Sequence, residues 1–272
     1  MTHYFEGKSA AVTGAGDGIG RALAMQLNAE GCALWLCDIS DERLQATYSQ
    51  LDAQSAPVHL RVVDCGDKQA IDAWVDEISQ HTQAIDAVFN NAGVAYSALF
   101  EDATEDNYQW LMGVNFWGVV WSSRAFLPLL TRAPVGHLVN VSSIFGMVGI
   151  ATQSAYNAAK FAVRGFTESL VAEYYDTSIR VSCVHPGGIA TNIARRARAD
   201  GQDAWATPEQ RDEQFKQYAS TTPQQAAAVI LKGVAQSKPQ ILIGRDAKLM
   251  HLFARLFPVR YHALTRRFLE HD

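Results

Sequence analysis

Residues 13–20 read Thr13-Gly14-Ala15-Gly16-Asp17-Gly18-Ile19-Gly20, with a glycine at every second position from Gly14 on. It follows a short β-rich run at 10–13 and opens an amphipathic pattern typical of a helix over 19–29. Glycines in such a turn let the backbone bend tightly and approach a pyrophosphate, which the positive end of the helix attracts. The turn alone is a weak signal, but the strand before it and the helix after it favour a dinucleotide site over a plain turn.

Short β-rich runs alternate with longer amphipathic patterns along most of the chain. Such alternation predicts an α/β fold with a doubly wound parallel sheet and helices on both faces. No repeat, low-complexity tract or linker divides the chain, so we predict one domain. The expected strands are 10–13, 33–37, 58–64, 87–90, 137–141, 180–185 and 241–243. The expected helices are 19–29, 41–51, 68–82, 104–130, 155–175 and 224–236.

Two segments depart from this alternation of strands and helices. Residues 192–222 carry charges and polar residues around Trp205 after the sixth expected strand, where a substrate lid would sit. From Arg245 on, six Lys/Arg stand against three Asp/Glu, whereas the rest of the chain has 17 Lys/Arg against 25 Asp/Glu. We therefore predict a dinucleotide-binding catalytic domain over 1–245 that includes the lid, followed by an amphipathic extension over 246–272.

The composition disfavours several classes of protein. Hydrophobic residues make up 48% and charged residues 19% of the 272 residues, so the chain can bury a sizeable core. The formal net charge of −5 argues against nucleic-acid binding. The cysteines and histidines show no ligand spacing, so no metal is expected. No signal peptide or run of 18 apolar residues is visible, which predicts a cytoplasmic protein with at most peripheral membrane contact.

Asp38 closes the second expected strand, 18 residues after Gly20. A carboxylate there can accept hydrogen bonds from the adenosine ribose hydroxyls and repels a 2′-phosphate. Asp17 adds a second negative charge in the turn, so NAD is favoured over NADP. Arg21 and Arg43 could still receive a 2′-phosphate, which leaves NADP less favoured rather than excluded. Alternatively, Asp38 only caps the helix that follows it.

Asp64 and the run Asn90-Asn91-Ala92-Gly93 end the third and fourth expected strands. Position alone does not decide whether Asp64 contacts an adenine or caps a helix. Small residues in the asparagine run leave room for a ligand, and its side-chain amides can hold loop backbone. Taken in isolation, this run is a turn signal.

Tyr156 and Lys160 are four residues apart at the start of a long expected helix, so both point from one face. A nearby ammonium and the positive ring of an oxidised nicotinamide would favour the phenolate and lower the tyrosine pKa from its usual value of roughly 10. Tyr156 could then exchange a proton with an alcohol oxygen. Ser143, 13 residues earlier, could hydrogen-bond the same oxygen, and Ser142 is the competing candidate.

The order of these motifs resembles that of the short-chain dehydrogenase/reductase family. The match covers residues 7–244, nearly the whole chain. The resemblance implies a Rossmann-type fold with strand order 3-2-1-4-5-6-7 and pro-S hydride chemistry on nicotinamide. The matching pieces, in chain order, are TGAGDGIG at 13–20, Asp38, Asn90-Asn91-Ala92-Gly93, Asn115, Ser143, Tyr156-Asn-Ala-Ala-Lys160 and Pro186-Gly187.

The resemblance also implies roles for the matching residues. Asn115 would help to hold a proton-relay water through its helix, Ser143 would polarise the substrate carbonyl, and Tyr156 would be the acid/base. Lys160 would bind the nicotinamide ribose and lower the pKa of Tyr156. Thr191 and the Ile189 backbone would hold the carboxamide, and Asn91 would lie near the ribose. The expected catalytic residues are Asn115, Ser143, Tyr156 and Lys160. The expected coenzyme-binding residues are Gly14, Asp17, Gly18, Ile19, Gly20, Asp38, Asp64, Asn91, Gly93, Tyr156, Lys160, Pro186, Ile189 and Thr191.

Simpler interpretations remain for some of these residues. Asn115 could merely cap a helix, and Pro186-Gly187 could merely form a turn. His185 lies beside the coenzyme end, but a lone histidine after a strand is more often structural than catalytic.

We predict an oxidoreductase that transfers a hydride between NAD(H) and a secondary alcohol or ketone, lipophilic in character, such as a steroid-like or long-chain compound. One alternative is a 3-oxoacyl thioester reductase that uses NADPH, with the basic run Arg195, Arg196 and Arg198 on the phosphates of its substrate. Another class, a non-catalytic dinucleotide-sensing protein, would not need the Ser/Tyr/Lys set. The expected pocket residues are Val94, Phe145, Met147, Val148, Ile193 and Trp205.

Family resemblance implies homodimers or homotetramers built through the helices at 104–130 and 154–176, where Trp117 and Trp121 could serve the interface. In the extension, Pro258 separates a first apolar helix from an expected second one around 261–269. Three interpretations compete for it: packing on its own domain or a partner subunit, covering the pocket, or touching a membrane surface. Its apolar residues at helical spacing are Leu249, Leu252, Phe253, Leu256 and Phe257.

Overall fold

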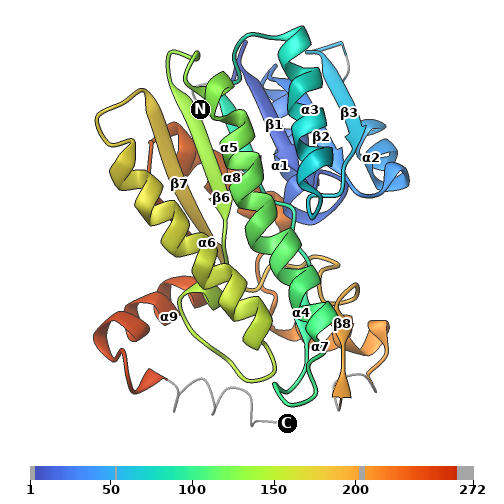
Figure 1. Ribbon diagram of the computed structural model, residues 1–272, viewed down its shortest axis with the longest axis vertical. Coiled ribbons are helices and arrows are strands. Elements are labelled where there is room, and N and C mark those ends of the chain that lie inside the picture. Colours follow the sequence, from blue (N-terminus) through green and yellow to red (C-terminus); the bar gives the residue numbers. More distant parts are fainter. Residues whose placement is uncertain (1–3, 53, 202–205, 262–272) are drawn as a thin grey trace.

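A seven-stranded parallel sheet forms the centre of the molecule (Figure 1). The computed structural model describes residues 4–52, 54–201 and 206–261. The strand order is β3-β2-β1-β4-β6-β7-β9, which confirms the predicted doubly wound sheet and its order. The strands are β1 (Ser9–Thr13), β2 (Ala33–Asp38), β3 (Val58–Val62), β4 (Ala87–Asn90), β6 (Gly136–Val141), β7 (Ile179–Pro186) and β9 (Gln240–Ile243).

Helices cover both faces of this sheet (Figure 1), as the alternation of patterns predicts. The helices in the described residues are α1 (Gly18–Ala29), α2 (Asp41–Tyr48), α3 (Lys68–His81), α4 (Glu105–Met112), α5 (Gly118–Leu130), α6 (Ser154–Glu173), α7 (Pro208–Tyr218), α8 (Pro223–Ala235) and α9 (Arg245–Leu256). Neighbouring residues of a strand point to opposite faces, so Ala10 and Val12 join the core under α1, α2 and α8, whereas Ala11 joins the core under α3 and α5.

The single helix expected over 104–130 is in fact interrupted. Between α4 and α5 the chain forms one π-helical turn, Gly113–Trp117. The buried Asn115 lies in this turn and forms two hydrogen bonds with the backbone of Val94. Its Nδ2 donates to the Val94 carbonyl, and its Oδ1 accepts from the Val94 amide, each at 2.8 Å. A π turn inserts an extra residue into a helix and re-aims a side chain, often at a functional site.

The segment expected to be a lid, 192–222, contains more regular structure than its composition indicates. A two-residue strand, β8 (Arg198–Ala199), pairs in parallel with β5 (Tyr96–Ser97), and α7 follows. Asp200 then accepts hydrogen bonds from Tyr96, Thr104 and Asn107. Residues 198–200 are therefore anchored to the rest of the domain, while Trp205 lies outside the described residues.

The first part of the extension forms α9, which packs on the domain. Its Ala247 is fully buried in a cluster with Ile144, Met147 and Val148 from the loop after β6. Met147 and Val148, expected to line the pocket, are members of this packed cluster. The second helix expected around 261–269 lies outside the described residues, apart from its first position.

Candidate active site

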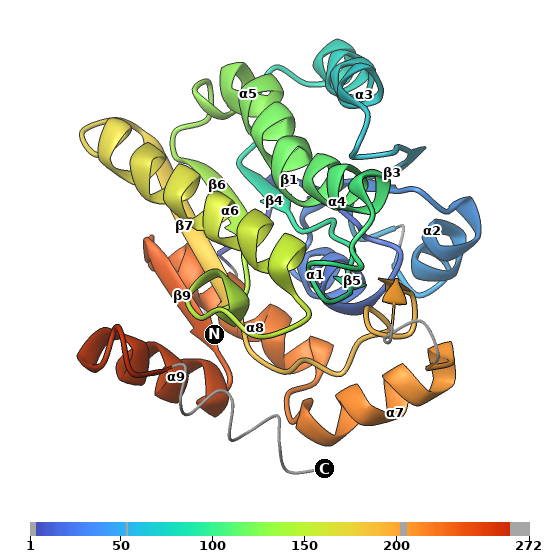
Figure 2. The same cartoon turned by 60° about the horizontal axis from the view of Figure 1, so that its bottom comes forward.

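The candidate site lies where β1, β2, β4, β6 and β7 end at one edge of the sheet, the lower end of the molecule in Figure 1. Because these strands are parallel, their carboxyl ends and the loops that follow them meet there. Figure 2 looks onto this end, with α9 on one side and α7 on the other. The order of strands reverses between β1 and β4, which is where open α/β sheets bind their ligands.

The glycine-rich turn has a backbone that only glycine can supply at two of its positions. Gly14 has φ +65°, and a Cβ on it would lie 2.8 Å from the Cα of Ala92. A Cβ on Gly20 would lie 2.1 Å from the carbonyl oxygen of Gly14, so α1 can approach the turn closely only without a side chain there. The turn thus brings bare backbone to the amino end of α1, where an anion is favoured, and these residues fit a dinucleotide pyrophosphate.

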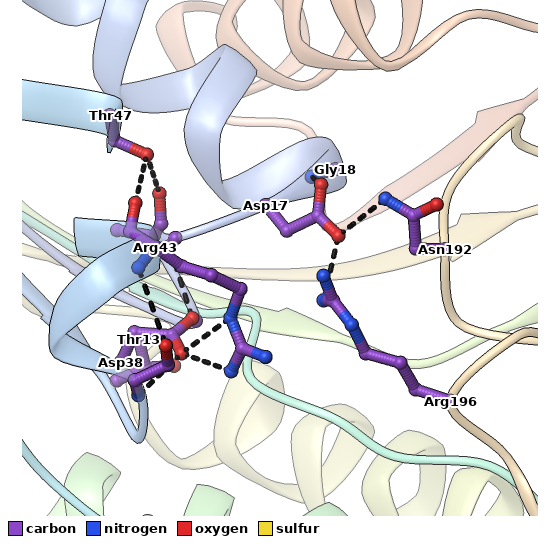
Figure 3. A network of polar contacts seen from close by, with 12 residues as sticks. Thr13, Asp17, Gly18, Asp38, Arg43, Thr47, Asn192 and Arg196 are labelled. Carbon is purple, nitrogen blue, oxygen red and sulfur yellow. Dashed lines mark hydrogen bonds and ion pairs between the residues drawn. The ribbon is translucent and has the colours of Figure 1, made fainter. Parts of the chain in front are cut away.

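Asp38 ends β2 and is almost fully buried, with 6% of its surface exposed. Its Oδ2 accepts from the amide of Gly16 at 3.0 Å, and its Oδ1 accepts from the amide of Ser40 at 3.0 Å. Arg43 reaches Oδ1 from α2 with Nε at 3.2 Å and Nη2 at 2.5 Å (Figure 3). Arg21, the other candidate for a 2′-phosphate, donates to the carbonyl of Gly16 and to Thr47. Both arginines therefore have partners within the protein.

Asp17 joins the glycine-rich turn to the segment after β7 (Figure 3). It is the N-cap of α1, with Oδ1 accepting from the amide of Gly18 at 2.8 Å. Its Oδ2 accepts from Asn192 Nδ2 at 2.9 Å and from Arg196 Nη1 at 2.7 Å. These contacts lower the pKa of Asp17, against the opposing effect of burial. The start of the expected lid is therefore tied to the place where a pyrophosphate would bind.

Asn91 and Asp64 follow β4 and β3 and have different contacts. Asn91 Nδ2 donates to the carbonyl oxygens of Thr13 at 3.0 Å and Gly14 at 3.3 Å, so its amide supports the glycine-rich turn. Asp64 Oδ1 accepts from the amide of Gly66 at 2.8 Å and forms a local turn. Asp67, not Asp64, caps α3.

Tyr156, Lys160 and Ser143 meet in one cluster between β6 and the first turns of α6. The Ser143 hydroxyl hydrogen-bonds Tyr156, whereas Ser142 is turned into the fold and donates to the Lys160 carbonyl at 2.8 Å. This arrangement favours Ser143 over Ser142 as the residue that faces a substrate. The Lys160 Nζ lies 5.7 Å from the centre of the Tyr156 ring and donates to the carbonyl of Val141 at 3.0 Å.

The pKa of Tyr156 moves opposite to the expectation from the sequence. Burial raises it to about 12, and the hydrogen bond with Ser143 only partly opposes this. Burial also lowers the pKa of Lys160 to about 8, because desolvation disfavours the charged amine. The expectation from the sequence considered the positive charges of Lys160 and of an oxidised nicotinamide, which lower the tyrosine pKa. Burial removes water from both Tyr156 and Lys160, and this loss disfavours the charged form of each group.

The turn after β7, residues 186–191, faces the glycine-rich turn. A Cβ on Gly18 would lie 2.9 Å from Cγ2 of Thr191, so the two turns approach each other within side-chain contact. Ile189 is buried, and the Thr191 amide donates to its carbonyl at 2.8 Å. Gly93 lies on the other side of the site, where a Cβ would come within 3.5 Å of the Lys160 amine.

Comparison with known proteins now identifies the chain. The family model described as short chain dehydrogenase matches residues 8–202. The chain belongs to the short-chain dehydrogenase/reductase family. It is therefore an oxidoreductase with a nicotinamide dinucleotide coenzyme and a small-molecule substrate.

Several relatives in this family match most of the length of this chain. A protein from Mycobacterium tuberculosis, described as putative oxidoreductase SadH, is 40% identical over 96% of this chain and 95% of its own. The dehydrogenase/reductase SDR family member 7B of Xenopus tropicalis is 30% identical over 88% of this chain and 78% of its own. A short chain dehydrogenase/reductase from Burkholderia phymatum, solved in complex with NAD, superposes with a TM-score of 0.84 at 25% identity, covering 94% of this chain and 95% of its own.

Sequence reasoning missed Asn157 in this short-chain dehydrogenase/reductase site, and it interpreted His185 as structural without identifying its partner. Asn157, next to Tyr156, donates to the carbonyls of Phe145 at 2.7 Å and Val148 at 2.8 Å and so holds the loop after β6. Buried His185 donates from Nδ1 to the carbonyl of Ser143 at 3.1 Å. The position of Asn157 beside the tyrosine was a usable signal, whereas the partner of His185 lies 42 residues away and leaves no local trace.

The described residues hold no group of three or more His, Cys, Asp or Glu side chains that could bind a metal ion. Likewise, within 4–52, 54–201 and 206–261, every helix is too short or too polar to cross a membrane.

Proposed function

We propose that this protein is an NAD(H)-dependent dehydrogenase or reductase that interconverts a secondary alcohol and its ketone, with Tyr156 as the acid/base. The observation that carries this proposal is the single cluster of Ser143, Tyr156 and Lys160 beside the two turns that would hold the coenzyme. A non-catalytic dinucleotide sensor would need those turns but not the cluster, so the cluster favours an enzyme.

In this proposal each residue of the cluster has one task. When bound, the coenzyme supplies or accepts the hydride at its nicotinamide ring. In the reduction direction, Tyr156 gives its phenolic proton to the ketone oxygen, and the Ser143 hydroxyl donates a hydrogen bond to that oxygen. Lys160 binds the nicotinamide ribose and, as ammonium, favours the phenolate left behind. Asn115, held in the π turn, orients a water that returns a proton to Tyr156.

The proposed coenzyme is NAD rather than NADP. Asp38 is a buried carboxylate at the end of β2, with its negative charge where the adenosine ribose would lie. Arg43 neutralises part of that charge, so the preference depends on this pair rather than on Asp38 alone. The rest of the proposed coenzyme site follows the set derived from the sequence, including Asp64 as an adenine neighbour.

For the substrate we propose a lipophilic compound. Phe145 lies edge-on to Tyr156, with ring centres 6.3 Å apart, and Val94 packs in the same cluster as Tyr156. The alternative, a 3-oxoacyl thioester, needs free arginines in the run 195–198. Arg195 is paired with Glu209 and Arg196 with Asp17, so the structure favours the lipophilic substrate.

We also propose a homodimer or homotetramer. Trp117, at the end of the π turn, stacks on Trp121 of α5 with ring centres 6.1 Å apart, and Phe161 lies 40% exposed on α6. Exposed aromatic side chains on two adjacent helices are typical of a protein interface.

The test is the absorbance of reduced coenzyme with NAD and a panel of secondary alcohols, for the wild type and Tyr156→Phe. We expect turnover by the wild type and a loss of kcat of at least ~100-fold in the variant, with NADH binding retained. Tyr175→Phe, which removes an exposed hydroxyl just beyond α6, is the matched control and should keep full activity. A Tyr156→Phe protein with activity near the wild type would overturn the assignment.

A further inference from the structure

The turn over 186–191, which the proposed function assigns to the nicotinamide carboxamide, is held in place from three directions. The Gly187 amide donates to the Ile243 carbonyl of β9 at 2.9 Å. The Ala190 amide donates to the Thr221 carbonyl, before α8, at 2.9 Å. The third support is a side chain: the Gly188 amide donates to Asp246 Oδ2 at 2.6 Å. Asp246 lies in the first turn of α9, 58 residues further along the chain.

The Asp246 carboxylate fills the space that two glycines leave open. A Cβ on Gly187 would lie 2.1 Å from Oδ2, and a Cβ on Gly244 would lie 2.1 Å from Oδ1. Gly244, the N-cap of α9, also has φ +95°, a conformation that other residues rarely adopt. The turn after β7, the start of α9 and this carboxylate are therefore fitted to one another.

One oxygen of Asp246 has no hydrogen-bond partner within the described residues. Oδ1 is buried and accepts no hydrogen bond from any residue in the described part of the chain. A buried, half-satisfied carboxylate is costly, and the positive amino end of α9 offsets only part of that cost. Local helix stability therefore does not explain why a carboxylate stands here, whereas fixing the Gly188 amide does.

We propose that Asp246 is a positioning residue for the nicotinamide half of the coenzyme site. By holding Gly188, it sets the backbone of Ile189 and the place of Thr191, which would receive the carboxamide. This inference rests on the proposed function, because it needs a bound nicotinamide. It also makes α9 part of the coenzyme site, and the same helix packs Ala247 against the loop that follows Ser143.

The proposal separates two halves of the coenzyme. ADP-ribose contains the adenosine, the pyrophosphate and the second ribose but lacks the nicotinamide ring. It uses the glycine-rich turn and the Asp38 region, and it makes no carboxamide contact with the turn over 186–191. A defect confined to that turn should therefore weaken NADH binding and leave ADP-ribose binding unchanged.

The experiment compares the dissociation constants of NADH and ADP-ribose, by titration calorimetry, for the wild type and variants at position 246. We expect Asp246→Ala to weaken NADH about tenfold, the scale of a lost charge-assisted hydrogen bond, with ADP-ribose unchanged. Asp246→Asn keeps an acceptor for the Gly188 amide and should weaken NADH by only about threefold. Lys248→Ala, an exposed residue in the same helical turn, is the control and should change neither constant.

The proposal would be overturned if the folded variants had the same ratio of NADH to ADP-ribose affinity as the wild type. Such a result would mean that Asp246 has either no role in coenzyme binding or only a general structural one. If Asp246→Ala fails to fold, Asp246→Asn carries the same test through the same ratio. A wild-type protein that binds neither ligand would instead contradict the proposed dinucleotide function, so the two failures are distinguishable.

Discussion

Asp38 has more partners than a residue that only ends a strand. It receives the Gly16 amide, the Ser40 amide and the Arg43 guanidinium, and it is 6% exposed. A ribose hydroxyl that reaches this carboxylate must share it with Arg43 or displace that side chain. The choice between NAD and NADP therefore depends on what Arg43 does when Asp38 is occupied.

Exchange of Asp38 for serine should reverse part of the coenzyme preference. The wild type should prefer NAD, because the carboxylate accepts from the ribose and repels a 2′-phosphate. In Asp38→Ser the repulsion is gone and Arg43 is free to bind the phosphate, so the ratio of kcat/KM for NADP to that for NAD should rise tens- to hundredfold, the scale of a charged hydrogen bond. Kinetics with both coenzymes at one fixed alcohol measure it.

The double variant Asp38→Ser with Arg43→Ala is the matched control for this ratio. It should lose most of the gain in NADP use if Arg43 is the phosphate partner. A wild type that already prefers NADP, or a ratio that Asp38→Ser leaves unchanged, would show that Asp38 is only a structural cap.

Two buried histidines should make the fold sensitive to acid. Burial lowers the pKa values of His137 and His185 from 6.5 to about 4. The unfolded chain therefore binds protons at these positions near pH 6.5, whereas the folded protein binds them only near pH 4. The free energy of unfolding should fall as the pH drops from 6.5 to 4, by up to about 3 kcal/mol for each histidine.

Urea unfolding at a series of pH values between 4 and 7 tests this expectation. His137→Gln and His185→Gln should each be less stable than the wild type at pH 7 but lose less stability on acidification. A pH dependence that neither substitution reduces would assign the acid sensitivity to other groups.

At the scale of elements, periodicity predicts those helices and strands that bury one face each. The seven sheet strands and the helices between them follow the alternation of the sequence, with ends that shift by a few residues, as at 58–64, where the strand stops at Val62. The π turn at Gly113–Trp117 was not predictable, because the contact made from it, between Asn115 and Val94, joins residues 21 positions apart. The strand pair β5–β8 was not predictable either, since two residues carry no periodicity.

The candidate site likewise contains residues that the sequence predicts and residues that only the fold brings together. Residues whose chemistry and spacing sit in one short stretch, such as Tyr156 and Lys160, were predictable, and the structure brings them together with Ser143. Asp246 was not, because its role depends on α9 packing beside β9 and the loop after β6 and so on the whole fold. Arg43 was considered only as a phosphate partner, and its pairing with Asp38 needs the three-dimensional arrangement of β2 and α2.

The first turn of the expected lid should control coenzyme exchange. Arg196 and Asn192 hold this segment on Asp17, at the amino end of α1. Arg196→Ala removes an ion pair whose side chains are 46% and 23% exposed, so the effect should be small: about a threefold faster dissociation of NADH. Stopped-flow displacement of NADH measures this rate.

Arg195→Ala is the matched control for the exchange rate. Its side chain pairs with Glu209 on α7 and does not touch the glycine-rich turn, so the rate should stay unchanged. Equal acceleration in both variants would mean that general loosening of the segment, not the contact with Asp17, sets the rate.

Over the whole molecule, charge and apolar surface are unevenly distributed. The body of the chain is acidic, whereas the stretch from Arg245 on is basic, with six Lys/Arg against three Asp/Glu. Helix α9 has two different faces: Ala247, Met250 and Ala254 lie in the cluster with Met147 and Val148, and Leu249, Leu252 and Leu256 are 67%, 54% and 62% exposed. The inner face supports the interpretation that the extension packs on its own domain. The outer face leaves apolar surface for a partner subunit or a membrane.

Two variants of the extension should separate the tasks of these faces. Deletion of 247–272 uncovers Ile144, Met147 and Val148, which are 6%, 5% and 1% exposed in the intact protein. Burial of such a side chain stabilises a fold by about 1.5–3 kcal/mol, so the deletion should lower Tm by about 10 °C.

Replacement of Leu249, Leu252 and Leu256 by serine leaves the inner face intact and should not lower Tm. If the outer face joins subunits, this triple variant should run as a smaller species in size-exclusion chromatography with light scattering. An unchanged association state together with lost binding to anionic vesicles would instead assign the outer face to a membrane surface, because exposed leucines beside Lys248 and Arg255 have the character of an interfacial helix.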